Sequence, residues 1–499
     1  GGAVKFRTKD PKDLLKPQGN ASYLNLKSGY SSANEQFHET ITAANRSGAL
    51  ESMVVVTRRD GHETETRGGG SDDAVGATRG LADPADLGST NVLGKLAYQL
   101  NDDNRIGLVA EQYQLNSEMD LKSQSSTTST QQADDQLQRK HVGIWHENMA
   151  SNPVYDELKW QLDYQEKNTE NGTHIDSSSQ ARYVDRTYAQ KEIQLRADAS
   201  KTLGIQTLNY GVSYTRGSLE NLNKNDVNGA VTVSRFSPKA QSNIFGAYLR
   251  DNIAVTNKWN LIPAVRYDHY RYTTESDSYI DDWGDNKNQA VTGQLGSEYA
   301  LTDHYTLFAK YGTGFRAPGM EDLYYYYENA GSVGNYHYGY IIEPNPDLKP
   351  ERSTFLEGGL RTQGQYGHGE ITAFYNRYRN FIEQVTVGTS TTYPTGIFTN
   401  ENIDRAVIKG IEAKGELQLA EIFHAAPQGL HWRSAVAYAK GKNTSDDEPL
   451  DSVAPLTFAN TLGYDAPNNQ WGSDLTGTWR AAKKASDITE SYQWQAIPS

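Results

Sequence analysis

The chain has 499 residues, no cysteine and a formal net charge of -14. The lack of cysteine excludes disulfides, zinc–thiolate sites and thiol catalysis. The acidic balance argues against general nucleic-acid binding, so we expect no nucleic-acid partner. Charged residues make up 22% of the chain, and no stretch approaches the ~18 consecutive apolar residues of a membrane helix. A membrane β-barrel remains compatible with this composition, because only alternate residues of its strands face lipid.

Strands with one apolar and one polar face are predicted along most of the chain. Leu158, Trp160 and Leu162, for example, alternate with Lys159 and Gln161. In chain order, about nineteen strands are expected near 21–31, 35–45, 50–60, 90–100, 104–117, 140–148, 155–167, 182–200, 206–218, 241–255, 259–273, 289–301, 305–315, 353–362, 369–385, 405–419, 430–442, 455–465 and 471–481. The 32 Tyr against 12 Phe suit the aromatic girdles of such barrels.

The connections between these strands alternate in length. Short turns are expected at 45–48, 101–104, 202–205, 256–258, 302–304 and 466–469. Long polar links are expected at 61–89, 118–139, 168–181, 219–240, 274–288, 316–352, 386–404 and 443–454. Short periplasmic turns alternating with long outer loops are typical of an outer-membrane barrel. We therefore predict that all long links leave one rim and all short turns the other.

The number of expected strands indicates the size class of the barrel. Porins have about 16–18 strands and plugged transporters have 22. The sequence therefore predicts an all-β, antiparallel transmembrane β-barrel of the 22-strand transporter type, here incomplete. Its first strand, near 21–31, and its last, near 471–481, are expected not to pair with each other. Tyr492, Trp494 and Ala496 resemble the opening of a further strand. No signal peptide is visible at Gly1, so we expect a processed chain or a fragment.

Two sequence boxes flank the long link at 316–352. The first consists of Phe315, Arg316, Ala317 and Pro318, and the second begins with Asn345, Pro346, Asp347 and Leu348 and continues to Glu351. They resemble the FRAP and NPDLKPE boxes of TonB-dependent receptors, which flank the seventh outer loop in that family. The prolines cannot donate to a sheet, so they end strands and stiffen the base of the loop.

Other segments support this resemblance and imply a domain organisation. Residues 1–8 are similar to the last strand of the family's plug domain, and 407–412 resembles a strand after the eighth outer loop. The resemblance implies the tail of a plug at 1–17 and a barrel that lacks its last strands at 18–499. It also implies a multi-pass protein of a Gram-negative outer membrane, surrounded by lipopolysaccharide, that works with the TonB complex.

His337 is the candidate ligand residue. It lies between the two boxes, where haem-importing members of the family carry an outer-loop histidine. Histidine and tyrosine both ligate haem iron, and aromatic rings suit a porphyrin face. Nearby tyrosines supply such rings, and those that could form a ligand site with His337 are Tyr324, Tyr325, Tyr326, Tyr327, Tyr336, Tyr338 and Tyr340. The segment 57–63 also resembles the haemoglobin receptor subgroup, so we expect import of haem or of haem from haemoproteins.

Several alternatives stay open on the sequence. Haem would be a transported ligand and we expect no permanently bound cofactor; tyrosine-rich loops would equally suit a catecholate ferric siderophore. A passive pore or surface adhesin is the alternative of another class. No enzyme is expected, because no nucleophile elbow, P-loop or HExxH motif stands in the right context. A cluster of loop carboxylates, Asp277, Asp281, Asp282 and Asp285, is either a calcium site or a solvated loop.

Overall fold

The computed structural model describes residues 7–488 except 67, 330, 334–335, 446 and 469. The side chains of 332–333, 336–337 and 404 also lie outside the described part. Among the described residues, no helix is long and apolar enough to cross a membrane.

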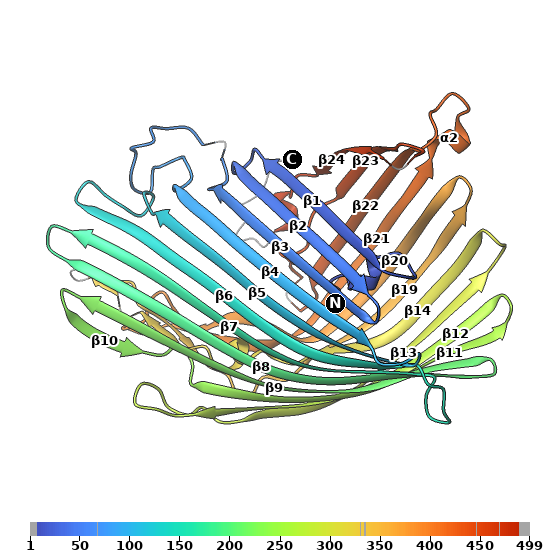
Figure 1. Cartoon of the computed structure of the whole chain (residues 1–499). Coiled ribbons are helices and arrows are strands. Elements are labelled where there is room, and N and C mark those ends of the chain that lie inside the picture. The colour runs from blue at the N-terminus through green and yellow to red at the C-terminus, as the bar shows by residue number, and fades with distance from the viewer. Residues whose placement is uncertain are drawn as a thin grey trace.

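One large sheet of strands dominates the molecule and curves into a wall (Figure 1). Pairing connects 22 described strands, of which three, β10, β15 and β18, are short strands of the outer loops and nineteen form the wall. The wall strands are β1 (Ala21–Ser31), β2 (Gln36–Ser47), β3 (Leu50–His62), β4 (Ala85–Gln99), β5 (Asn104–Asp120), β6 (Ser129–Asn148), β7 (Glu157–Ser177), β8 (Ala181–Leu203), β9 (Gln206–Val227), β11 (Lys239–Thr256), β12 (Trp259–Glu275), β13 (Asn286–Ala300), β14 (Tyr305–Arg316), β19 (Glu351–Gly364), β20 (Gly367–Gly388), β21 (Gly396–Gln418), β22 (Leu430–Asn443), β23 (Thr457–Asp465) and β24 (Gly472–Arg480). The predicted fold class and the expected number of strands are confirmed.

The remaining elements are short and lie outside the wall. The loop strands are β10 (Ala230–Ser234), β15 (Tyr327–Asn329), β16 (Ser332–Val333), β17 (Tyr336–His337) and β18 (Tyr340–Glu343). The helical turns are η1 (Pro11–Asp13), α1 (Met320–Tyr324), α2 (Leu419–Ile422) and η2 (Ala485–Asp487).

Every wall strand pairs antiparallel with its neighbour in the chain, so connections alternate between two rims. Two-residue turns at Gly48 and Gly204, both with positive φ, lie at the short-turn rim, as tight hairpins require. The turn at Asn101–Asp103 shares that rim, whereas the segment 317–350 leaves the opposite one. The predicted division into two rims is confirmed. We call the rim with 317–350 the outer rim and the other the inner rim.

The wall is not closed within the described residues. There β1 pairs only with β2, and β24 only with β23. The prediction that residues 21–31 and 471–481 do not pair is therefore confirmed for the described part of the chain.

Several predicted loops are wrong, because the strands continue into them. The segment 168–181 belongs mostly to β7 and β8, which leave only residues 178–180 between them. Much of 219–240 is likewise taken up by β9 and β10. Above the apolar band both faces of a strand meet water, so the apolar alternation disappears while backbone pairing continues. A pattern search based on apolar residues cannot detect such extensions.

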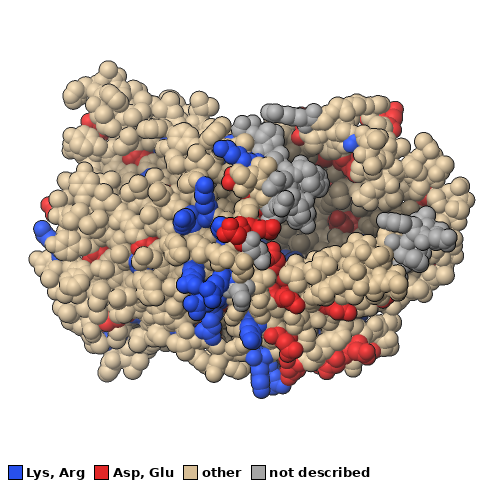
Figure 2. Space-filling view, turned by 180° about the vertical axis from the view of Figure 1, so that it is seen from behind, with Lys and Arg blue, Asp and Glu red and all other residues tan. Residues whose placement is uncertain are grey.

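Alternation assigns side chains to the outside or the inside of the wall. On β5, Ile106 and Leu108 are exposed on the outside, while Arg105 and Val109 are buried on the inside. From behind, a broad surface with few charged side chains is bordered by a line of Lys, Arg, Asp and Glu (Figure 2). An apolar outer band with a polar interior is the arrangement that lipid requires.

The segment before β1 lies against the inner face of this wall. Leu15 packs in a cluster with Ala44, Met53 and Val109 of the first strands. Asp10 receives a salt bridge of 2.8 Å from Lys95 of β4. Both contacts hold the segment inside the curve of the sheet.

Candidate functional site

The seventh outer connection, residues 317–350, folds inward across the mouth of the wall; we call it loop 7. Its helix α1 places Leu323 and Tyr324 in the buried core at the mouth, both at 0% exposure. They pack with Tyr270 and Tyr272 of β12. The Tyr324 hydroxyl also donates to the Gly284 carbonyl at 3.1 Å. Loop 7 is therefore seated on the wall by a large apolar contact.

The first sequence box forms one side of a clamp at the base of loop 7. The Arg316 guanidinium donates from Nε to Glu351 Oε2 at 2.9 Å and from Nη2 to Oε1 at 2.8 Å. A third nitrogen donates to Asp322 of α1 at 3.0 Å. Glu351 is buried and also accepts the Ile382 N–H at 2.9 Å. A bidentate arginine–carboxylate pair fixes geometry as well as charge, so both ends of loop 7 are held together.

The second box completes the clamp through amide side chains. Asn286 of β13 donates to the carbonyls of Pro346 and Leu348, at 2.7 Å and 3.1 Å. The Asn345 side chain donates to the Asn400 carbonyl at 2.8 Å. The Asn400 side chain in turn donates to the Asp322 carbonyl of α1 at 2.9 Å. These bonds satisfy backbone groups that a proline-rich loop base cannot pair in a sheet.

Six aromatic side chains line the mouth beside this clamp, and we call them the aromatic arc. Its members are Tyr188, Phe236, Tyr325, Tyr327, Tyr340 and Phe398. The ring of Phe236 lies 6.5 Å from Tyr188, 6.0 Å from Tyr325 and 5.9 Å from Tyr327. Tyr340 continues the series, at 5.6 Å from Tyr327 and 6.2 Å from Phe398. Phe236 is buried at the centre of the arc, and the partly exposed rings around it offer aromatic faces to a flat aromatic ligand.

Loop 7 is also joined to the eighth outer loop, residues 389–395. Strand β18 pairs parallel with the start of β21, from Tyr340 with Gly396 to Glu343 with Thr399. Thr395 donates its hydroxyl to the Tyr338 carbonyl at 2.9 Å. The two loops therefore support the arc as one structure.

Three consecutive tyrosines of loop 7, Tyr324, Tyr325 and Tyr326, are neutral at physiological pH. Burial raises the pKa values of Tyr324, Tyr325 and Tyr326 to about 12. A phenol must lose its proton to become an anionic iron ligand. With pKa values this high, these tyrosines provide ring surface and hydroxyl donors.

The structure separates the tyrosines predicted as ligand contacts into different environments. Tyr325 and Tyr340 belong to the arc, and Tyr338 is 40% exposed beside it. Tyr324 is fully buried and packs the base of loop 7, so it presents no surface to a ligand in this arrangement. The side chains of Tyr336 and His337 lie outside the described residues; their backbone pairs with β16.

Sequence reasoning missed three members of the arc, Tyr188, Phe236 and Phe398. Tyr188 lies within the strand predicted near 182–200, and Phe236 and Phe398 lie within the polar links predicted at 219–240 and 386–404. An aromatic residue within a polar stretch was the only available signal, and it does not reveal which faces meet at the mouth.

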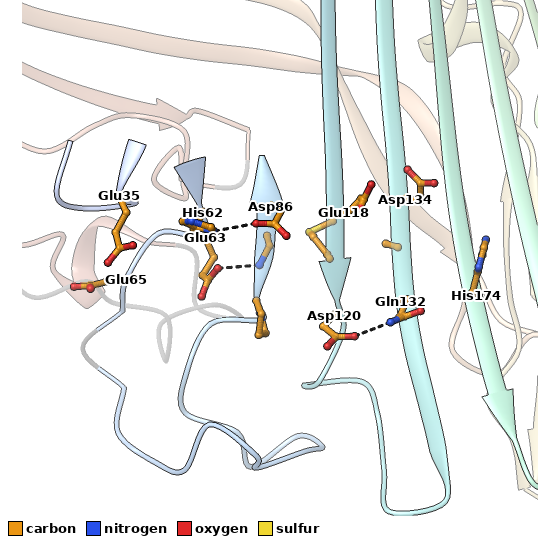
Figure 3. Close-up of a pocket in the computed structure, with 14 residues that line it drawn as sticks. Glu35, His62, Glu63, Glu65, Asp86, Glu118, Asp120, Gln132, Asp134 and His174 are labelled. Carbon is orange, nitrogen blue, oxygen red and sulfur yellow. Dashed lines mark hydrogen bonds and ion pairs between the residues drawn. The ribbon is translucent and has the colours of Figure 1, made fainter. Parts of the chain in front are cut away.

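A second candidate is an acidic cleft on the outside of the wall, formed by the outer ends of β3 to β7 (Figure 3). It measures about 770 Å³ and is lined by seven carboxylates and two histidines: Glu35, Glu63, Glu65, Asp86, Glu118, Asp120, Asp134, His62 and His174. His62 pairs with Asp86 at 3.1 Å. His174, predicted in a loop, lies in β7 and packs on Tyr183 at 4.8 Å.

Neither this cleft nor the predicted calcium loop forms a metal centre in the described part of the chain. There, no group of three or more His, Cys, Asp or Glu is arranged to hold a metal ion. In the loop, Asp277 pairs with Arg235 at 2.5 Å and Asp285 with Arg271 at 2.7 Å. Asp282 accepts hydrogen bonds from the Thr274 hydroxyl and the Gly284 N–H. These carboxylates hold the loop together.

Comparison with known families identifies the chain. The family described as TonB dependent receptor-like, beta-barrel, matches residues 57–498. The chain belongs to this family. Its members are outer-membrane transport receptors of Gram-negative bacteria and not enzymes, which agrees with the lipid-facing wall and the seated seventh loop.

Individual relatives of this receptor carry names that concern haemoglobin. Hemoglobin-haptoglobin utilization protein B of Neisseria meningitidis is 28% identical over 98% of this chain and 70% of the relative. Probable hemoglobin and hemoglobin-haptoglobin-binding protein 3 of Haemophilus influenzae is 22% identical over 100% of this chain and 70% of the relative.

Solved structures resemble the receptor in fold alone. Copper transporter OprC has a TM-score of 0.71 at 18% identity and covers 94% of this chain, with 68% of its own chain matched. The siderophore receptor PirA from Acinetobacter baumannii has a TM-score of 0.65 at 17% identity, with coverages of 93% and 68%. The names of these two proteins concern different cargoes, so the shared barrel does not identify the ligand.

Proposed function

We propose that this receptor imports haem, taken as such or from haemoproteins, through the outer membrane. The aromatic arc carries the proposal, because it offers a flat ring a series of aromatic faces at the mouth. The arc is held by two loops and the clamp, so little ordering is needed when a ligand arrives, which favours affinity. The names of the haemoglobin-binding relatives agree with this cargo.

We further propose His337 as an iron ligand on loop 7. Neutral imidazole ligates haem iron, and His337 lies in the loop that supplies three of the six rings of the arc. The raised pKa values of Tyr325 and Tyr326 disfavour phenolate ligation by these two tyrosines. Haem is cargo in this proposal and no cofactor is permanently bound.

The segment before β1 is proposed as the tail of a plug, residues 1–17, with the barrel occupying 18–499. Its contacts with the inside of the wall, through Leu15 and Asp10, fit a chain that leads from the lumen into β1. As a member of a TonB-dependent family, the receptor depends on the TonB complex and a ligand. Contact with lipopolysaccharide at the outer rim is part of the same proposal.

The test uses the natural full-length protein with His337→Ala. Haem binding is measured by Soret absorbance, and uptake by growth on haem as the sole iron source. The matched control is His174→Ala, an outer-rim histidine that packs on Tyr183 outside the wall. We expect loss of the Soret shift and of growth for His337→Ala, with the control unchanged. Wild-type spectra for His337→Ala would remove this residue from the site.

The same experiment separates the alternative cargoes. The arc would also suit a catecholate, so ferric-siderophore uptake is measured in parallel. Growth on a ferric catecholate but not on haem, in the wild-type strain, would favour the siderophore receptor. Haem uptake that persists in a strain without TonB would favour a passive pore, and no uptake with cell adhesion would favour an adhesin.

A further inference from the structure

An arginine for which the described residues provide no partner stands beside the aromatic arc. Arg186 lies in the outer part of β8 and is partly buried. Within the described residues, its guanidinium makes no hydrogen bond and no ion pair. By contrast, Arg235 and Arg316 at the same mouth are each bound to carboxylates. None of its nitrogens is among the buried side-chain atoms that lack a hydrogen-bond partner in the described part of the chain, so the guanidinium is open to solvent and available to a ligand.

The alternation of β8 directs Arg186 into the mouth. Ile193 and Leu195 are exposed on the outside, so the even-numbered residues face inward. Tyr188 confirms this, because its ring stacks on Phe236 of the arc with an interplanar angle of 16°. Arg186 shares this face with Tyr188.

Loop 7 brings the arc within electrostatic range of this arginine. Burial raises the pKa of Tyr325 to about 12, and the positive charge of Arg186 acts in the opposite direction. Tyr325 belongs to the arc through its contact with Phe236. A ligand resting on the arc would therefore lie close to an available positive charge.

The wall around Arg186 consists of neutral amides. Asn223 of β9 is its direct partner in register, and its buried Oδ1 accepts no hydrogen bond within the described residues. On the other side, Asn171 of β7 donates to Asp135 at 2.8 Å. Arg182, further along β8, donates to Asn225 at 2.7 Å. Arg186 and Asn223 thus offer unused donors and an unused acceptor side by side.

The nearby carboxylates do not neutralise this arginine. Asp135 accepts a hydrogen bond from Asn171, and neither Asp135 nor Glu321 of α1 forms an ion pair with Arg186 within the described residues. The positive charge is therefore available to an anion that enters the mouth.

We propose that Arg186 binds the carboxylate edge of an aromatic iron chelate whose ring plane rests on the aromatic arc. This inference rests on the proposed function and specifies its ligand chemistry, since haem carries two propionates at one edge. The guanidinium supplies paired donors that match a carboxylate. Arg186 thus selects the anionic edge, and the arc selects the ring.

The test compares two porphyrins that differ only at this edge. Haemin carries free carboxylates, and haemin dimethyl ester carries none. Affinities of both are measured for the natural full-length receptor in detergent, in wild type, Arg186→Gln and Arg186→Lys. The control is Lys191→Gln, which removes a cation from the outward face of the same strand, 3.9 Å from Glu166.

For Arg186→Gln we expect haemin to bind roughly 10- to 100-fold more weakly, as for loss of a hydrogen bond to a charged group. The ester should lose no more than about twofold, and Arg186→Lys should restore part of the haemin affinity. Equal losses for both porphyrins, or a loss no larger than that of Lys191→Gln, would overturn the role of Arg186. Binding of neither porphyrin by wild type would instead overturn the proposed function and this inference with it.

Discussion

The aromatic arc and the acidic cleft lie at the same rim but on opposite faces of the wall. The arc faces inward and combines rings from β8, the β10–β11 link, loop 7 and β21. The cleft faces outward, and among the described residues its lining contains seven carboxylates and no lysine or arginine. Because side chains alternate between the two faces of each strand, the arc and the cleft lie on different surfaces although they share a rim. A ligand that passes through the barrel must bind on the inner face of the wall. We therefore expect the transport site at the aromatic arc and not in the acidic cleft.

The two regions also differ in what holds them. The arc is supported by a buried core at Leu323 and Tyr324 and by the Arg316–Glu351 clamp. In the cleft, the bonds between lining groups are few, such as Gln132 with Asp120 at 3.1 Å and His62 with Asp86. Pre-organisation therefore distinguishes the two regions, and the following variants test it.

Tyr324→Ala should give the largest effect on the arc. Removing a fully buried aromatic side chain lowers stability by about 3–5 kcal/mol. In this receptor we expect the loss to weaken the attachment of loop 7 to the wall, and not the whole barrel. We expect loop 7 to become protease-sensitive and haem affinity to fall about 100-fold. Limited proteolysis and Soret titration measure both. Tyr366→Ala, an exposed tyrosine of an inner-rim turn, is the control. An intact loop 7 in Tyr324→Ala would show that α1 is not its anchor.

Glu351→Gln should weaken haem binding by about 10- to 30-fold. The substitution keeps the shape but removes the charge that Arg316 meets with two hydrogen bonds. A hydrogen bond to a charged group contributes about 1.5–3 kcal/mol. Water screens part of this contribution here, because the Arg316 side chain is half exposed. Soret titration is the measurement, with Glu357→Gln on the same strand as control. Equal affinities for both variants would contradict the clamp.

The boxes around loop 7 illustrate what sequence could and could not predict. Their order and spacing placed the loop at the outer rim, and the strand pattern predicted nineteen wall strands. The pairing of Arg316 with Glu351 and Asp322 could not be read from the sequence, because it depends on how α1 turns back over the mouth. The burial of Tyr324 was hidden for the same reason.

The arc was predictable only in part. Tyr325 and Tyr340 were expected from their place in loop 7, whereas Tyr188 and Phe236 come from strands and links far away in sequence. Those segments carry no apolar alternation, since both faces meet water above the membrane. Only three-dimensional pairing shows that β8 and loop 7 meet at one mouth.

The pH dependence of haem binding should separate histidine from tyrosine. Burial keeps the pKa values of Tyr325 and Tyr326 at about 12, so both stay neutral from pH 5 to 9. An imidazole with a pKa of ~6.5 becomes protonated as pH falls and then cannot bind iron. We expect affinity to fall roughly tenfold between pH 7.5 and 5.5, measured by Soret titration. His337→Ala should abolish this slope; a slope that persists would assign it to another group.

Phe236→Ala should weaken haem binding by about 3- to 10-fold. Phe236 contacts three rings of the arc, and each aromatic pair contributes about 0.5–1.5 kcal/mol beyond area burial. Tyr325→Phe, which keeps the ring and removes a neutral hydroxyl, should change affinity by less than about twofold. A larger loss in Tyr325→Phe than in Phe236→Ala would mean that the hydroxyl, and not the ring surface, binds the ligand.

The smallest effect is expected in the acidic cleft. Glu118→Gln and Asp134→Asn remove two carboxylates from the outward face of β5 and β6, and neither residue contacts loop 7 or the arc. Because the wall separates the cleft from the mouth, we expect less than a twofold change in haem affinity and in growth on haem. The double variant should also relieve repulsion among like charges and slightly raise the resistance of the barrel to heating in detergent. A loss of haem uptake as large as that of Phe236→Ala would place the outer face in the transport route, and the contrast between the two regions would then have to be abandoned.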